Sequence, residues 1–224
     1  MRDLIKQEQF ELEVLDRLNS KKLLNYLALG GGTMLRLCFG LNRFSVDLDF
    51  WIIKDVNTDK LYEELKEYLS GLYTLRDSAN KFYTLLFEIK SGDYPRSLKI
   101  EIRKEVKKIK TEQAIAYSRH SNTQVFLKVA ALKEMMKSKA EAFIGRKEIR
   151  DAFDMEFLLK KGIDIEAPPQ TLRKILKEIN SLKKKDYAVK LGSLLKEEER
   201  RYYTTENFKI LKAAIEKKIA DSSA

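Results

Sequence analysis

The chain has 224 residues, of which 44% are hydrophobic and 35% are charged, a balance that is typical of a folded globular protein. Its single cysteine, Cys38, excludes an intrachain disulfide framework, and its single histidine, His120, argues against a histidine-rich zinc site and a Ser-His-Asp triad. No apolar run approaches the ~20 residues of a membrane-spanning helix, and the charged residues 1–16 lack a signal-peptide core. We therefore expect a cytoplasmic protein without membrane association.

The net charge of +10 is unevenly distributed along the chain. Residues 1–100 contain 15 basic and 15 acidic side chains, whereas residues 101–224 contain 29 and 19. This pattern predicts a balanced first half joined to a basic half that suits a polyanion such as RNA. A solvated Lys/Glu-rich surface is the alternative. The most basic clusters are Lys104, Lys107, Lys108 and Lys110, and then Lys183, Lys184, Lys185 and Lys190.

The first elements along the chain are a helix over residues 4–18 and a short apolar strand over residues 26–29. Three glycines follow, and Thr33 is placed to cap a short helix that ends at Gly40. Glycine allows the backbone to approach a ligand closely, and a helix N-terminus offers free N–H groups to an anion. A tight turn without a ligand is the alternative. The chain contains no P-loop motif, which disfavours P-loop ATPase or GTPase chemistry.

Residues 46–53 are apolar, β-branched or aromatic except for two aspartates, and they predict a strand. Side chains alternate between the faces of a strand, so Asp47 and Asp49 point the same way. Two neighbouring carboxylates repel each other unless a positive charge lies between them, and Mg²⁺ is a common solution because it prefers oxygen ligands. A solvated strand face is the simpler explanation of an isolated Asp-x-Asp, but the preceding glycines favour the metal site.

Two further carboxylates are candidates for the same site. A turn at residues 91–95 joins two predicted strands; Glu101 lies on the second and Glu88 on the first. Glu101 alternates with apolar residues, so it completes a three-carboxylate site if its strand lies beside the aspartates. An exposed position paired with lysine is the alternative for either residue. The elements predicted in this part of the chain are a helix over 58–69 and strands over 72–76, 82–90 and 98–103.

The pattern becomes helical after about residue 110. Helices are predicted over 123–140, 147–161, 171–183 and 205–219. These elements indicate an α+β fold, with a small mixed β-sheet flanked by helices and then a helical C-terminal half. We expect an α/β core at residues 1–110 and a helical domain at residues 111–224 that completes the active-site groove.

Two motifs resemble a known family. The first consists of Gly31-Gly32-Thr33 followed by Arg43-x-Ser45-x-Asp47-x-Asp49-Phe50, and the second of Lys128-Val129-Ala130-Ala131 followed by Arg146-x-x-x-Arg150-Asp151-x-x-Asp154. Together they are similar to the AbiEii and MenA-type nucleotidyltransferase toxins of type IV toxin–antitoxin and abortive-infection systems. That group belongs to the DNA polymerase β-like nucleotidyltransferase superfamily. The first motif is the more specific, and Arg150 stands where the family often has lysine.

The resemblance implies roles for these residues. Asp47 and Asp49 would hold Mg²⁺, with Glu101 as third ligand, and Lys128 would neutralise the charge of the triphosphate. Asp151 would be a catalytic acid that orients Lys128 or the nucleophile. The residues implied to contact the nucleotide are Gly31, Gly32, Thr33, Arg43, Ser45 and Lys128. The alternatives are a solvated helical lysine at position 128 and surface acids at 151 and 154 that pair with Arg150 or Lys147.

The function predicted from these features is Mg²⁺-dependent transfer of a nucleoside monophosphate from an NTP to RNA. The resemblance favours tRNA as the acceptor and implies a cognate antitoxin. A protein or small-molecule acceptor, or a non-catalytic module that binds nucleic acid or an antitoxin, is the alternative. The basic second half favours RNA, and the intact acidic residues disfavour a non-catalytic module.

Overall fold

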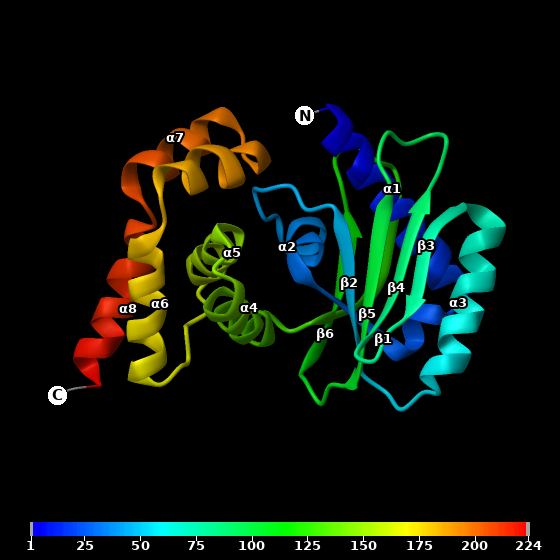
Figure 1. Ribbon diagram of the computed structural model, residues 1–224, viewed down its shortest axis with the longest axis horizontal. Coiled ribbons are helices and arrows are strands. Elements are labelled where there is room, and N and C mark those ends of the chain that lie inside the picture. Colours follow the sequence, from blue (N-terminus) through cyan, green and yellow to red (C-terminus); the bar gives the residue numbers. More distant parts are fainter. Residues whose placement is uncertain (1, 223–224) are drawn as a thin grey trace. The chain divides into compact units, whose positions relative to one another are not determined.

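The computed structural model describes residues 2–222 and divides into two compact units, Met1–Ala131 (unit 1) and Leu132–Ala224 (unit 2) (Figure 1). Unit 1 contains a seven-stranded mixed sheet in the order β3-β4-β5-β2-β1-β7-β6. Its strands are β1 (Leu27–Gly30), β2 (Asp47–Ile52), β3 (Thr74–Asn80), β4 (Thr84–Lys90), β5 (Leu98–Val106), β6 (Thr111–Tyr117) and β7 (Gln124–Ala130). The predicted α+β class is therefore confirmed.

Within this sheet, β2 runs parallel to β5 and antiparallel to β1, so the predicted aspartate strand has a neighbour on each side. One face of the sheet is apolar because Leu48, Phe50 and Ile100 are fully or almost fully buried. Helices α1 (Arg2–Ser20) and α3 (Thr58–Leu72) cover it, and the Tyr62 ring of α3 stacks on Phe87 of β4 at 5.3 Å between centroids. We call the opposite face, which carries Asp47 and Asp49, the acidic face.

The ends of the helices follow ordinary capping chemistry. The side chain of Asn57 accepts hydrogen bonds from the amides of Asp59 and Lys60 at the start of α3. Helix α2 (Gly31–Phe39) ends at Gly40, which adopts a left-handed conformation with φ of 79° that glycine tolerates best. Its N-cap is Gly30 and not Thr33, so the predicted cap was wrong by three residues.

The largest departure from the predicted elements lies at residues 111–130, which form the hairpin of β6 and β7. The predicted helix over 123–140 is wrong in its first half, because Val125, Leu127 and Val129 alternate with polar or exposed residues and form a strand. Unit 1 consequently extends to Ala131, beyond the expected boundary at residue 110, since β7 pairs with β1 inside the sheet.

Unit 2 is helical. It contains α4 (Leu132–Arg146), α5 (Ile149–Lys160), α6 (Pro169–Ser181), a π-helical segment η2 (Asp186–Leu191), a short 3-10 segment η3 (Gly192–Leu194), α7 (Glu197–Glu206) and α8 (Lys209–Asp221). Pro169 occupies the first position of α6, where its missing N–H costs no helical hydrogen bond. Within residues 2–222, no helix is long and apolar enough to span a bilayer.

Candidate active site

The glycine turn lies directly against the aspartate strand. Gly30, the last residue of β1, pairs with Asp49 of β2, and Gly31 then begins α2 with a φ of +71°. A Cβ atom on Gly31 would lie 2.1 Å from Oδ2 of Asp49. A Cβ atom on Gly32 would lie 2.5 Å from Nη2 of Arg43 and 2.8 Å from Oγ of Ser45. The two glycines therefore allow the backbone at the start of α2 to approach the predicted site residues closely.

Asp47 and Asp49 share the acidic face, as the alternation predicts, and both are half-buried. On the neighbouring strand β5, Asp47 is in register with Lys99 and Asp49 with Glu101. Lys99 forms an ion pair with Glu101. The pKa of Lys99 is raised, first by its hydrogen bond to Glu101 and then by the charges of Glu101, Asp47 and Asp49. A lysine thus supplies positive charge among the carboxylates.

Of the two candidates for a third carboxylate, Glu101 is the nearer to the aspartates. It lies on β5, which borders β2, whereas Glu88 lies on β4, one strand farther away, in register with Lys99. No group of three or more acidic, histidine or cysteine side chains within residues 2–222 is arranged as a metal site. Asp47 and Asp49 therefore remain the pair of carboxylates on β2 that share the acidic face, while the carboxylate of Glu101 forms an ion pair with Lys99.

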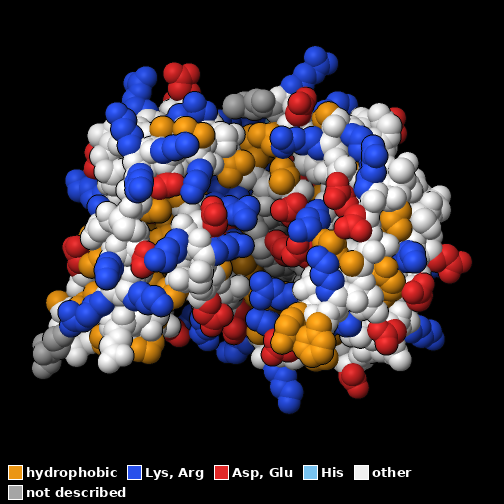
Figure 2. Space-filling view, viewed as in Figure 1, with side chains coloured by type: hydrophobic (Ala, Val, Ile, Leu, Met, Phe, Trp, Pro, Cys, Tyr) orange, Lys and Arg blue, Asp and Glu red, His pale blue; other side chains and the backbone are white. Residues whose placement is uncertain are grey.

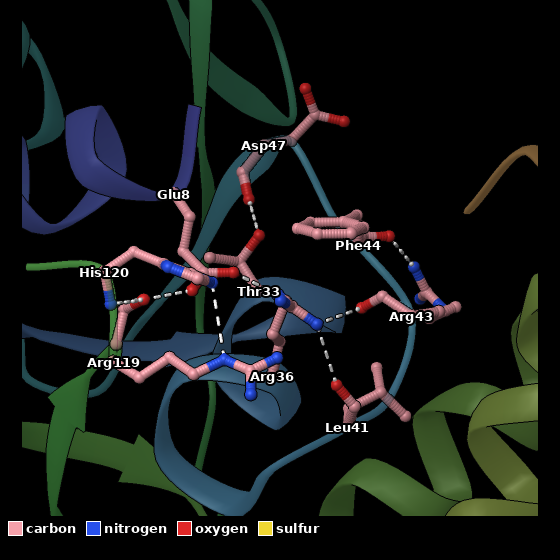
Figure 3. Close-up of polar contacts among 10 residues, drawn as sticks. Glu8, Thr33, Arg36, Leu41, Arg43, Phe44, Asp47, Arg119 and His120 are labelled. Atoms are coloured by element: carbon pink, nitrogen blue, oxygen red, sulfur yellow. Dashed lines mark hydrogen bonds and ion pairs between the residues drawn. The ribbon is translucent and has the colours of Figure 1, made fainter. Parts of the chain in front are cut away.

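The segment that carries Arg43 and Ser45 is fastened to α2 by hydrogen bonds (Figure 3). Nη1 of Arg36 donates to the carbonyl oxygens of Leu41 at 3.2 Å and Arg43 at 3.3 Å. Thr33 is fully buried, and its Oγ1 donates to the carbonyl oxygen of Asp47 at 2.6 Å. Its hydroxyl group therefore fixes the position of Asp47.

Arg43 is 3% exposed, and its Nη1 donates to the carbonyl oxygen of Phe44 at 3.0 Å. Its guanidinium group also lies beside Gly32, at the positive end of α2. A buried cation next to free helical N–H groups makes this end of α2 attractive to an anion. Arg43 and Gly32 therefore both contribute to a positive region next to the aspartates.

Helix α1 contributes buried acidic side chains that sequence reasoning missed. Glu8 forms an ion pair with Arg36 and accepts a hydrogen bond from Ser118 (Figure 3). Glu11 is fully buried, and neither carboxyl oxygen has a hydrogen-bond partner. Burial raises the pKa of Glu11 well above its ordinary value, and the charges of Glu8 and Asp47 add to this effect, while Arg36 opposes it. Acidic residues on the otherwise apolar face of residues 4–18 were the available signal.

Lys128 lies on β7 and not on a helix, so the predicted lysine helix is incorrect at this position. Val129 is in register with Leu29, whose neighbours in the sheet, Phe50 and then Ile102, point toward the apolar face. The adjacent residue, Lys128, therefore lies on the acidic face, two strands away from β2 and half-buried. Lys128 therefore lies in unit 1 with the aspartates, on a strand where a helix was expected.

Asp151 and Asp154 are fully buried on α5 in unit 2, which contradicts the interpretation of these residues as surface acids. Nε and Nη2 of Arg146 donate to the two carboxylate oxygens of Asp151, each at 2.7 Å. Nζ of Lys139 lies 2.6 Å from Asp154 and 3.4 Å from Asp151. Lys139 was missed by sequence reasoning: the predicted helix ended at residue 140, whereas α4 continues to Arg146 and puts the two cations two turns apart on one helix. The partners proposed for these acids, Arg150 and Lys147, are both exposed.

Comparison with known proteins identifies the family and the fold of this chain. Residues 13–220 match the family described as nucleotidyl transferase AbiEii toxin, type IV toxin–antitoxin system. A candidate nucleotidyltransferase from H. pylori has a similar crystal structure, with 24% identity and a TM-score of 0.57 over 93% of this chain and 96% of that chain. The JHP933 protein from Helicobacter pylori is similar over 93% and 97% of the two chains, with 22% identity and a TM-score of 0.52.

These two likenesses show the fold, while the family match extends over nearly the whole chain. The comparison with curated proteins gives no match. The glycine turn and the paired aspartates both lie within the matched residues. The chain belongs to the AbiEii family of nucleotidyltransferase toxins.

Proposed function

We propose that the protein transfers a nucleoside monophosphate from an NTP to an RNA acceptor, with tRNA as the favoured acceptor, and that Mg²⁺ is required. The observation that carries this proposal is the close approach of Gly31 to the Asp49 carboxylate, which leaves no room for a Cβ atom, beside Asp47 on the same strand face. A toxin of a type IV system implies an antitoxin that counters this activity.

The residues present fit a divalent cation. Asp47 and Asp49 offer half-exposed carboxylate oxygens on one face, and a hard cation such as Mg²⁺ prefers oxygen ligands. Glu101 would join them once its carboxylate is released from Lys99. When bound, Mg²⁺ would neutralise phosphate charge and polarise the reacting phosphoryl group.

The start of α2 is the proposed binding surface for the phosphates. The amides of Gly31, Gly32 and Thr33 lie in the first turn, where no helical carbonyl accepts them. Ser45 lies next to Gly32 and offers a hydroxyl donor, and Arg43 adds a positive charge. We propose that Lys128, on the same sheet face, neutralises charge on the triphosphate.

In the proposed reaction, a hydroxyl oxygen of the acceptor forms a bond to the α-phosphorus of the NTP. The bond between the α-phosphorus and the bridging oxygen breaks, and pyrophosphate leaves in line with the attack. The hydroxyl proton passes to a carboxylate of the acidic face. The chain contributes mainly position and charge, which are the dominant contributions to phosphoryl-transfer catalysis.

Asp151 is assigned a supporting role in this proposal. Its carboxylate holds Arg146 in a bidentate pair and approaches Lys139, so it orients two cations of unit 2. The side chain of Arg146 is 48% exposed, which leaves part of its guanidinium group accessible to a phosphate. Asp151 therefore acts on a ligand through these cations in our proposal.

The test is incubation of the protein with each labelled NTP, Mg²⁺ and total RNA. We expect label on RNA with the wild type and no label with the Asp47→Asn/Asp49→Asn double variant. Asp55→Asn, which changes an exposed carboxylate beyond the end of β2, is the matched control and should transfer at the wild-type rate. Label on protein in place of RNA would show that the acceptor is a protein. Transfer at the wild-type rate by the double variant would contradict the assignment of Asp47 and Asp49 to the active site.

A further inference from the structure

The turn between β3 and β4 exposes two aromatic rings. Phe82 is 83% exposed and Tyr83 is 76% exposed, the highest values among the exposed large hydrophobic side chains of the described residues. Their ring centroids are 4.5 Å apart, and the ring planes meet at 86°. This edge-to-face arrangement leaves ring faces open to solvent. Single exposed apolar residues are ordinary, but two adjacent aromatic rings at a turn form a specific surface feature.

The backbone beneath these rings is held in place. The amide of Lys81 donates to the carbonyl oxygen of Thr84 at 3.0 Å, and the amide of Lys104 donates to that of Tyr83 at 3.0 Å. Nζ of Lys104 donates to Oδ1 of Asn80 at 2.8 Å and to the carbonyl oxygen of Lys81 at 3.1 Å. The turn is thus docked on β5, so the rings would lose little backbone freedom on binding a ligand.

Positive charge surrounds the turn. Lys81 and Arg103 are exposed, and Arg103 is in register with Thr84, the first residue of β4. Residues 101–131 contain seven basic and three acidic side chains. One acid, Asp59, contacts the end of β3, where it accepts a hydrogen bond from Asn80 at 2.7 Å. In Figure 2, hydrophobic side chains at the lower end of unit 1 have Lys and Arg side chains beside them, together with some Asp and Glu side chains. The surface therefore combines ring faces with an excess of cations.

The acidic face connects this turn to the candidate site. Arg103 and Glu101 point to the same face because they are two residues apart on β5, and Glu101 is in register with Asp49. The turn lies directly before β4, and β4 is two strands away from β2. Strand spacing and rise put it roughly 15 Å from Asp49. A nucleic acid strand that ends at the aspartates would reach the rings with nucleotides that precede its end.

We propose that Phe82 and Tyr83 form a stacking surface for unpaired nucleotides of the RNA acceptor, whose phosphates contact Arg103 and Lys81. Bases of any kind stack on aromatic rings, and lysine and arginine neutralise the backbone. Charge complementarity favours RNA over an apolar protein surface, because the exposed apolar area consists of only two rings and cations border it. This inference rests on the proposed RNA acceptor and adds the place where it binds.

Binding of a fluorescein-labelled, single-stranded 12-nucleotide RNA, measured by anisotropy without NTP, tests the proposal. Phe82→Ala/Tyr83→Ala should weaken binding about tenfold or more, since loss of one stacked base alone costs roughly 5- to 140-fold. Phe82→Tyr/Tyr83→Phe keeps both rings and should bind like the wild type. Tyr117→Ala/Phe126→Ala removes two other exposed rings, on β6 and β7, and should also bind like the wild type. Circular dichroism verifies the fold of each variant.

Two further measurements identify the ligand class. An RNA duplex of the same length should bind the wild type and the Phe82→Ala/Tyr83→Ala variant equally, because paired bases cannot reach the rings. Arg103→Gln/Lys81→Gln should reduce the slope of log affinity against log salt by about 1 to 2, from the loss of two phosphate contacts. Unchanged single-strand affinity after loss of the rings would overturn the proposal. Ring-dependent binding to anionic phospholipid vesicles, without ring-dependent RNA binding, would replace RNA by a membrane surface.

The failure of this inference differs from the failure of the proposed function. Phe82→Ala/Tyr83→Ala should weaken binding of the single-stranded RNA by the same factor in the Asp47→Asn/Asp49→Asn background as in the wild type, because the turn lies two strands away from the aspartates. Transfer to RNA with no effect of the ring substitutions on RNA binding would overturn the stacking surface alone. Ring-dependent RNA binding with no transfer from any NTP would support the stacking surface and contradict the proposed function.

Discussion

At the scale of single residues, the candidate site depends on side chains that are absent as much as on those present. Gly31 and Gly32 have no Cβ atoms, and the space is taken by Asp49, Arg43 and Ser45. The positive φ of Gly31 adds a second requirement for glycine. Sequence reasoning identified these glycines and the aspartates because both patterns are local.

Gly31→Ala should abolish nucleotide transfer with only a modest loss of stability. The new methyl group would displace the Asp49 carboxylate, and the left-handed backbone costs alanine about 1–2 kcal/mol. Urea unfolding and NTP transfer measure the two effects. Gly71→Ala is the matched control, because Gly71 lies inside α3 with no heavy atom within 4 Å of an added Cβ, and it should leave transfer unchanged. Transfer at the wild-type rate by Gly31→Ala would show that the glycine turn is not required for nucleotide transfer.

Glu11→Gln should stabilise the protein at neutral pH. The raised pKa keeps the Glu11 carboxyl protonated in the folded state at pH values where the unfolded chain has already released the proton. The wild type therefore loses stability as pH rises from the ordinary glutamate pKa toward the raised value. Glutamine removes this loss, so the unfolding free energy should depend less on pH above 4.5, the ordinary value. Glu64→Gln, an exposed position on α3, should leave the profile unchanged.

At the scale of elements, α1 and α2 hold the site through the Glu8–Arg36 ion pair, and Arg36 also holds the following loop. The ion pair joins residues 28 positions apart in the chain, which explains why sequence reasoning missed it. The strand β2 was predictable from alternation within a few residues. The strand β7 was not, since its alternation is interrupted by Phe126 on the polar side and it leads into the helical residues of α4.

Arg36→Ala should destabilise the protein by about 3–5 kcal/mol, because it leaves the buried Glu8 carboxylate without its cation. Arg36→Lys keeps the positive charge but cannot donate in the same fork to Leu41 and Arg43, so it should lose less stability and still reduce transfer. Urea unfolding gives the stability, and NTP titration separates KM from kcat. Equal stability of the alanine variant and the wild type would show that the pair contributes nothing to folding.

At the scale of the whole molecule, the chain has two compact units, each with its own buried polar network. The α+β class and the helical second half followed from the sequence, because periodicity reports them directly. The position of the boundary did not, since it depends on the long-range pairing of β1 with β7. Likewise, the buried partners of Asp151 and Asp154 lie on α4 and not at neighbouring positions in the sequence.

Asp151→Asn should destabilise unit 2 by about 1–3 kcal/mol, because Arg146 loses its charged hydrogen-bond partner while Lys139 keeps Asp154. Trp51, the only tryptophan, lies on β2 and reports unit 1, whereas far-UV circular dichroism is dominated by helices. In urea, the dichroism transition should shift to lower concentration while the Trp51 fluorescence transition stays. Asp164→Asn, an exposed acid, is the control. Equal shifts of both signals would mean that the two units unfold together.

The pairing of Leu29 with Val129 also governs when the sheet can form during synthesis. A hundred positions separate these two residues, so the contact closes a long loop and belongs to the slow class of folding events. Until β7 has been synthesised, β1 presents an open edge to other chains, which is a risk for aggregation. A nascent chain that stops near residue 110 already contains both aspartates but lacks the strand that covers this edge. The toxin's core therefore becomes a finished fold only after residue 130 has left the ribosome.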